Sequence, residues 1–272
     1  MKYRYRITLD NAKKMLEIAH QKKSKVKLIG SVQGWSPKTY HSGIKELIRA
    51  GFDYVALGGV AKAPNETIIP ILHEIRETVV KAKAKLHVLG VARLNMLDEY
   101  KKANVASCDS ASSIMQAFKS NKENYHTPEK NYTAVRIPAV QGHPSPKVRK
   151  LLRKYAEEGD PEDIDKRKIW LANLENAALC ALREYAAKNI SLKKAMNKLV
   201  EYEDQFGDEK KYYPLFEEVL YDRPWEKCHC AICKSIGVDV ILLRGNNRNR
   251  RRGFHNTYVF YKMFKEKSKE KS

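Results

Sequence analysis

Residues 26–59 read VKLIGSVQGWSPKTYHSGIKELIRAGFDYVALGG, and their pattern indicates the class of fold. A short apolar strand is followed by a glycine-containing turn, an amphipathic helix and a second apolar strand that ends in two glycines. Ser36 is a helix N-cap residue with Pro37 at the first helical position, and Gly51 ends the helix. The stretch therefore predicts one β/α unit and the strand of the next.

The same unit recurs through the first third of the chain, after a helix expected at 9–22. Strands are expected at 26–32, 54–59, 86–91 and 105–109. Strands that alternate with helices pair in parallel and place their chemistry at the C-terminal strand ends. Four units make half of a TIM-type barrel, whose usual size is about 250 residues. The expected fold class is α/β, a partial TIM-type (β/α) barrel of about four units at 1–119.

The remainder of the chain does not supply four more units. Residues 120–223 are interpreted as an extended linker followed by a helical insertion, because polar residues and scattered prolines give way to long amphipathic stretches. Residues 224–272 are interpreted as a zinc-binding, arginine-rich subdomain. It would hold a strand at 238–243, an arginine-rich turn and a final helix from about His255.

The net charge of the chain indicates which class of partner to expect. The chain has 272 residues, with 52 Lys and Arg against 32 Asp and Glu, a formal charge of +20. Such an excess favours a polyanion, with nucleic acid first. No apolar run approaches the roughly 18 to 20 residues of a membrane span, and the start lacks the apolar core of a signal peptide. The expectation is a cytoplasmic protein without a membrane partner.

Three of the five cysteines stand within six positions, in the sequence CHCAIC at 228–233. Three thiolates and one imidazole fill a tetrahedral zinc shell and leave no position for a substrate water, which makes such a site structural. The alternative is a chance cluster of buried cysteines, and His229 competes with His255 as the fourth ligand. The expected ligands of the structural Zn²⁺ are Cys228, Cys230, Cys233 and His255.

A run of arginines at 244–253 lies between the last expected strand and His255. Guanidinium groups interleaved with Asn and flanked by Gly suit contacts with phosphates, which dominate the affinity for nucleic acids. A solvated basic loop is the alternative. The candidate nucleic-acid-binding residues are Arg244, Arg248, Arg250, Arg251 and Arg252.

Asp109 stands at the end of the fourth expected strand. A carboxylate there acts as a nucleophile, as a metal ligand or as the N-cap of the next helix, and the residues alone favour the cap. The glycine-rich strand ends at 33–34 and 58–59 admit close approach by a flat ligand.

Five motifs in this order and spacing resemble the tRNA-guanine transglycosylase superfamily. They are Val32-Gln33-Gly34, the stretch 51–59, Leu89-Gly90-Val91, Cys108-Asp109-Ser110-Ala111, and the cysteine cluster with His255-Asn256. The stretches 33–37, 173–179 and 244–256 are most similar to the DNA-modifying branch, deoxypurine-in-DNA protein A. That branch exchanges guanine in DNA for a 7-deazaguanine base such as preQ0.

The resemblance implies a base-exchange glycosyl transfer on DNA, with tRNA as the alternative substrate. Asp109 would attack the anomeric carbon, guanine would leave, and the incoming 7-deazaguanine base would release the covalent glycosyl enzyme. The target nucleotide would be flipped out of its stack. By the same matching, the base pocket would be lined by Gln33, Gly34, Gly58, Gly59, Leu89 and Gly90.

Two departures accompany the resemblance. Trp35 stands where other family members carry Gly, although the DNA-modifying branch shares this Trp. The resemblance begins at about residue 5, with the second half of the barrel. The half that holds the other catalytic Asp, the general acid/base, has no counterpart in this sequence. A half barrel would expose two strand edges and an apolar inner face. We therefore expect a partner N-terminal half barrel or a homo-oligomer, or else a shortened gene product. The rival function is a non-catalytic, zinc-stabilised nucleic-acid-binding subunit.

Overall fold

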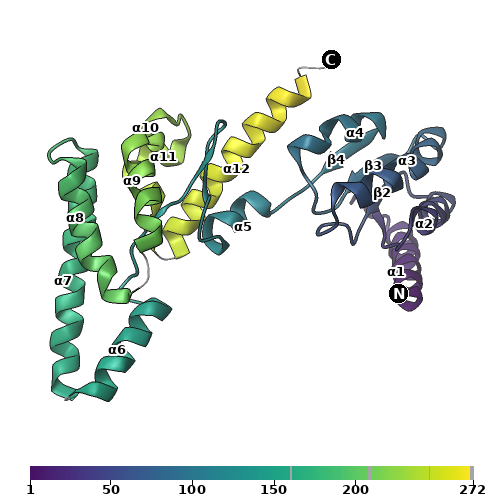
Figure 1. The fold of residues 1–272 in the computed structure, drawn as a ribbon. Helices are drawn as coiled ribbons and strands as arrows, with labels where there is room; N and C mark the ends of the chain where they lie inside the picture. Colours follow the sequence, from purple (N-terminus) through teal and green to yellow (C-terminus); the bar gives the residue numbers. More distant parts are fainter. Residues whose placement is uncertain (160, 208–209, 245, 270–272) are drawn as a thin grey trace. The chain divides into compact units, whose positions relative to one another are not determined.

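The computed structural model describes residues 1–159, 161–207, 210–244 and 246–269, with only the backbone at 158, 161–162 and 246–248. Its contacts divide the chain into two compact units, Met1–Ala111 with Phe264–Ser272, and Ser112–Met263. We call them unit 1 and unit 2 and describe each by itself (Figure 1).

Unit 1 is built on a parallel sheet whose four strands follow one another in chain order. A helical segment connects each strand to the next, so the predicted β/α alternation and parallel pairing are confirmed (Figure 1). A TIM barrel is not shown. The strands are β1 (Gly30–Val32), β2 (Tyr54–Leu57), β3 (Lys85–Val88) and β4 (Val105–Cys108). The helices are α1 (Lys2–Gln21), α2 (Pro37–Arg49), α3 (Asn65–Lys81), η1 (Leu94–Met96) and α4 (Leu97–Lys102).

The start of α2 is fixed by a capping box. The Ser36 hydroxyl accepts a hydrogen bond from the backbone N–H of Thr39, and the Thr39 hydroxyl accepts one from the N–H of Ser36. Two N–H groups at the open end of the helix are satisfied in this way. The predicted start of this helix is confirmed. By contrast, α1 begins at Lys2, earlier than predicted, and β1 lacks the expected residues 26–29.

The two faces of the sheet differ in character. Val55, Leu57 and Val88 have no exposed surface and share a core with apolar residues of α2 and α3. Side chains alternate along a strand, so Tyr54, His87 and Ser107 belong to the opposite face, where each is half-buried. The expectation that the inner face is apolar is therefore wrong, because the sheet face opposite the helices carries hydroxyl and imidazole groups.

Unit 2 is mostly helical around its own core. The segment expected as a linker contains a two-stranded antiparallel hairpin and a strand that pairs in parallel with β8. The strands are β5 (Tyr125–His126), β6 (Asn131–Tyr132), β7 (Val135–Arg136) and β8 (Leu242–Leu243). The helices are α5 (Ser112–Lys119), α6 (Pro146–Glu158), α7 (Pro161–Ala186), α8 (Leu192–Glu203), η2 (Asp204–Phe206), η3 (Lys210–Tyr212), α9 (Tyr213–Asp222), α10 (Pro224–Lys227), α11 (Ala231–Ile236), η4 (Gly237–Ile241) and α12 (Asn246–Lys269).

Two sequence-based expectations fail at the end of unit 2. The strand expected at 238–243 is mostly the helical turn η4, because a short apolar run buried on all sides carries no periodicity that separates strand from helix. The arginine-rich turn is the first part of α12. Arg favours helices, and the buried positions Arg252, His255, Asn256 and Val259 follow the spacing of one helical face.

None of the helices in the described ranges combines the length and apolar character needed to cross a bilayer.

Candidate active site and metal centre

Asp109 follows β4 directly and is tied to the end of β3. Its Oδ1 accepts a hydrogen bond from the backbone N–H of Gly90 at 2.8 Å and lies 3.1 Å from the His87 Nε2. The Asp109 side chain is 58% exposed. In the part of the chain that the structure describes, no hydrogen bond reaches Oδ2. One carboxylate oxygen is thus anchored, the other has no hydrogen bond among the described residues, and a carboxylate exposed in this way can act as a nucleophile.

His87 belongs to a chain of hydrogen bonds across three strands. Its Nδ1 lies 2.5 Å from the Ser107 hydroxyl, which in turn contacts the Tyr54 hydroxyl. If Tyr54 donates to Ser107 and Ser107 donates to Nδ1, the remaining proton of the neutral imidazole is on Nε2 and points at Asp109. With this assignment, every donor in the hydrogen-bond network has an acceptor. The network holds the imidazole in one orientation against the carboxylate.

This histidine was not identified from the sequence. The alternation of strand residues could have placed Ser107 and Asp109 on one face, but the register that pairs His87 with Ser107 is known only from the structure.

The expected base-pocket residues lie at the C-terminal ends of β1, β2 and β3. Gln33 and Leu89 are exposed, and Gly34 is half-buried before α2. A Cβ added to Gly58 would come within 2.8 Å of the Ser31 hydroxyl oxygen and 3.2 Å of the Gln33 Cγ. Gly58 and Gln33 therefore pack against each other, with Gly59 following. The structure brings Gly90 to Asp109 through the hydrogen bond described above.

Two features of the structure favour glycine at position 90. Its φ is +74°, which L side chains rarely adopt, and an added Cβ would lie 2.9 Å from the Ala61 Cβ. This backbone conformation directs the Gly90 N–H at the Asp109 carboxylate.

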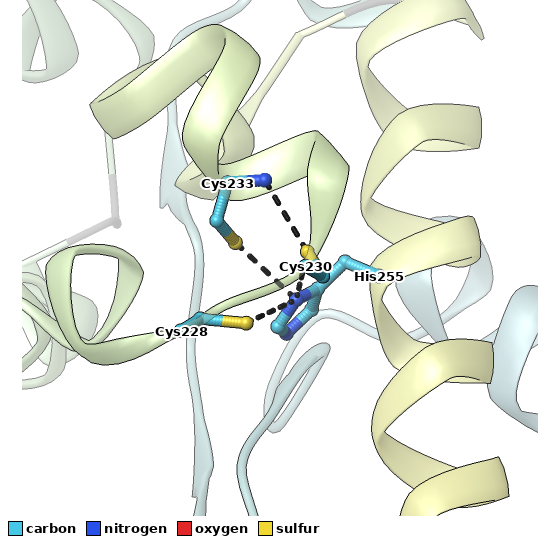
Figure 2. A group of neighbouring side chains, drawn as sticks. All are labelled: Cys228, Cys230, Cys233 and His255. Atoms are coloured by element: carbon cyan, nitrogen blue, oxygen red, sulfur yellow. Dashed lines mark hydrogen bonds between the residues drawn. The ribbon is translucent and has the colours of Figure 1, made fainter.

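Cys228, Cys230, Cys233 and His255 form one cluster, in which all four ligand atoms lie within 4.8 Å of one another. Figure 2 shows the three thiols and the imidazole turned toward one another. The His255 Nδ1 lies 3.5, 3.5 and 3.3 Å from the three sulfurs in sequence order. Bonds of about 2.3 Å to sulfur and 2.0–2.1 Å to nitrogen in a tetrahedron would separate S from N by about 3.6 Å. The cluster could hold a metal ion.

The surroundings of His255 fix which nitrogen faces the thiols. The Nε2 of His255 donates to the backbone carbonyl of His126 at 2.8 Å, so Nδ1 is the free acceptor. The ring stacks on Tyr125, with ring centroids 4.1 Å apart. A hydrogen bond with Cys233 is the main cause that lowers the pKa of Cys228 below that of a free thiol. The thiolate, which is the form that binds a metal cation, is therefore favoured at this position.

The arginines of the run at 244–253 have different surroundings. Arg250 and Arg251 are exposed, and the side chain of Arg248 lies outside the described residues. Arg244 forms an ion pair with the buried Glu175, which also accepts a hydrogen bond from the N–H of Val140 at 2.8 Å. A guanidinium committed to this pair is not offered to a phosphate.

Arg252 is fully buried, which contradicts its expected role in phosphate contact. Its guanidinium donates to three backbone carbonyls and one side-chain amide, those of Ala117, Val240, Leu242 and Asn249. Burial lowers the pKa of Arg252 to about 10, which leaves the group charged at neutral pH. Arg252 therefore joins the start of α12 to α5 and β8.

Replacing Arg252 with Ala is expected to destabilise unit 2 by about 3–5 kcal/mol, because buried carbonyls lose their donors and a cavity remains. Urea unfolding followed by circular dichroism measures the change. The neighbouring exposed Arg251→Ala is the matched control, and we expect it to change stability by less than about 0.5 kcal/mol. Equal effects of the two substitutions would contradict the structural role of Arg252.

The Asp109 carboxylate at a strand end of a parallel sheet and the Cys₃His cluster are the two groups of this chain that can carry chemistry. No protein-family model matches the chain. Among curated proteins, a DNA-guanine transglycosylase of Salmonella montevideo is 38% identical over 236 residues, which are 85% of this chain and 54% of that protein. The chain thus spans about half the length of this relative.

Proposed function

We propose that this chain carries the nucleophile of a base exchange that replaces guanine in DNA with a 7-deazaguanine base. The observation that carries the proposal is the Asp109 carboxylate, whose Oδ1 is held by Gly90 and His87 while Oδ2 has no hydrogen bond among the described residues. The similarity to a protein named DNA-guanine transglycosylase supports the same chemistry and favours DNA over tRNA.

The proposed reaction has two displacements at the anomeric carbon of a flipped-out nucleotide. Asp109 Oδ2 attacks C1′ and forms an ester, the C1′–N9 bond breaks, and guanine leaves with the electron pair and takes up a proton. The N9 of the incoming base, losing its proton, then attacks C1′ and breaks the ester. Asp109 returns to its carboxylate form, and the configuration is retained because it is inverted twice.

Residues of this chain have distinct parts in the proposed reaction. The Gly90 N–H and the His87 imidazole anchor Oδ1, so that Oδ2 approaches C1′ from a fixed direction. Gln33, Gly34, Gly58, Gly59 and Leu89, at neighbouring strand ends, are the proposed lining of the base pocket. No residue of this chain is assigned to protonate the leaving guanine. We propose that a second half barrel, or a second copy of this chain, completes the site.

For the Cys₃His cluster we propose Zn²⁺ as the occupant. Three sulfur ligands and one imidazole are typical of structural zinc. Held by Cys228, Cys230, Cys233 and His255, the ion would join α11 and the segment before it to α12. Its contribution is to the fold of unit 2, with no step of the reaction assigned to it.

The direct test is incorporation of labelled base into nucleic acid by the complex that co-purifies with this chain from its native host. We expect labelled guanine to enter duplex DNA but not tRNA. Incorporation into tRNA alone would contradict the DNA assignment. A complex that binds DNA without incorporating label in any condition would favour the rival, non-catalytic function. Activity of the isolated monomer would remove the need for a second half barrel.

His87→Gln is expected to slow exchange about 10- to 100-fold, since one hydrogen bond to a charged group and the orientation of Asp109 are lost. The step affected is formation of the covalent intermediate, so single-turnover trapping should show a slower first displacement with unchanged DNA affinity. His73→Gln is the control, because His73 pairs with Glu99 on the helical side of unit 1. A loss of DNA affinity instead of rate would contradict the positioning role.

A further inference from the structure

A basic stripe on α6 is not used by the proposed function above. The 13-residue helix carries side chains of one sign on one side, Arg149, Lys150, Arg153 and Lys154. All four are exposed. We call this set the α6 basic face.

The opposite side of α6 fixes the orientation of this face. Val148 is fully buried, and Leu151, Leu152 and Tyr155 pack against the core of unit 2. The Ser145 hydroxyl caps the helix by accepting a hydrogen bond from the N–H of Val148. A helix anchored along these positions turns the basic residues outward. The α6 basic face is therefore held in place by the fold.

The α6 basic face lines a hollow of about 620 Å³. Pro146 borders it at the start of the helix and Glu157 at the other end. The hollow is thus lined by four cationic side chains and one carboxylate. Several cationic side chains on one exposed helix face suit a polyanion.

We propose that the α6 basic face binds the phosphate backbone of duplex DNA, an inference that rests on DNA as the substrate of the proposed function. From Arg149 to Lys154 the helix advances about 7.5 Å, at 1.5 Å per residue. A duplex carries about one charge per 1.7 Å of its axis, so the charge density of the face is close to that of its partner. Arg149 and Arg153 can each bind a phosphate through two N–H groups.

Part of the arginine run at 244–253 is committed to contacts within the protein. Arg252 is buried and Arg244 is paired with Glu175, which leaves fewer of these arginines for phosphates. The contacts of the α6 basic face are with the backbone and do not read bases, so it positions DNA irrespective of sequence.

The test uses the full chain, in the complex that co-purifies with it, and fluorescence anisotropy with labelled duplex DNA at several salt concentrations. A variant with Arg149, Lys150, Arg153 and Lys154 all changed to Gln should bind at least roughly tenfold more weakly. Its plot of log K against log salt should be flatter by about 3 to 4, since each lost phosphate contact removes about 0.9. The control replaces four exposed lysines of unit 1, Lys2, Lys14, Lys22 and Lys25, with Gln.

Equal losses in the two variants would overturn the proposal, because net charge alone would then explain them. So would tRNA that binds more tightly than DNA of equal length and loses the same affinity. If the fourfold variant does not fold, Lys150→Gln with Arg153→Gln should still flatten the slope by about 2. The binding measurement needs no catalysis, so a failure of base exchange and a failure of this inference are read separately.

Discussion

Replacing Asp109 with Asn should abolish base exchange, with a fall in rate of at least about 10⁴-fold, as for the loss of other enzymatic nucleophiles. The amide has the shape of the carboxylate, and its oxygen can still accept the hydrogen bond from the Gly90 N–H. It lacks the charge that attacks C1′ and forms the ester. Because the side chain is 58% exposed, the fold should tolerate the change within about 0.5 kcal/mol.

The decisive readout for Asp109 is the covalent intermediate. DNA incubated with the complex in the absence of an incoming base should form an adduct that survives denaturation, and Asp109→Asn should form none. Asp53→Asn is the matched control, since Asp53 is an exposed carboxylate directly before β2 and pairs with Lys27. Undiminished exchange by Asp109→Asn would show that another group is the nucleophile.

Replacing Cys230 with Ser should release the metal and unfold unit 2. Cys230 is 3% exposed, and its sulfur lies within 4.8 Å of the three other ligand atoms. Binding of structural zinc contributes about 10–16 kcal/mol in small zinc modules, which exceeds the stability of most domains. Elemental analysis should find about one zinc per wild-type chain and much less in the variant.

Hydrogen exchange makes the second test specific to one unit. Amides of α11, α12 and β5 should lose protection in Cys230→Ser, while those of β2 and β3, which have a separate core, should keep it. Cys180→Ser is the control, because Cys180 is exposed on α7 and lies outside the cluster. A wild-type chain that is folded but binds no metal would contradict the zinc assignment.

The parts of the fold that the sequence predicted are those with local signals. Ser36, Pro37 and Gly51 mark both ends of α2 within one short stretch, and each strand of unit 1 lies in a short segment rich in apolar residues next to such a helix. The cluster of candidate metal ligands was also predictable, because three cysteines within six positions bring thiols together whatever the rest of the chain does. The choice of His255 over His229 was not local, yet the cluster contains His255.

Other features depend on contacts between distant residues and were not predictable. Arg252 has the same sequence signal as Arg251, and only the docking of α12 against α5 and β8 buries one and exposes the other. His87 meets Asp109 because of the register between β3 and β4, which a single sequence does not reveal. The hairpin of β5 and β6 has strands of two residues each, too short for any alternation to be seen.

The side-chain hydrogen bonds of α12 join residues that are far apart in the sequence, which affects the folding rate. Arg252 reaches Ala117 across 135 residues, His255 reaches His126 across 129, and Asn256 reaches Asn124 across 132. Unit 1, by contrast, pairs each strand with the next along the chain. Closing loops of such length costs entropy before any contact is gained, and folding rates fall as the sequence separation of contacts rises. We expect unit 2 to fold more slowly than unit 1, with the docking of α12 as its late step.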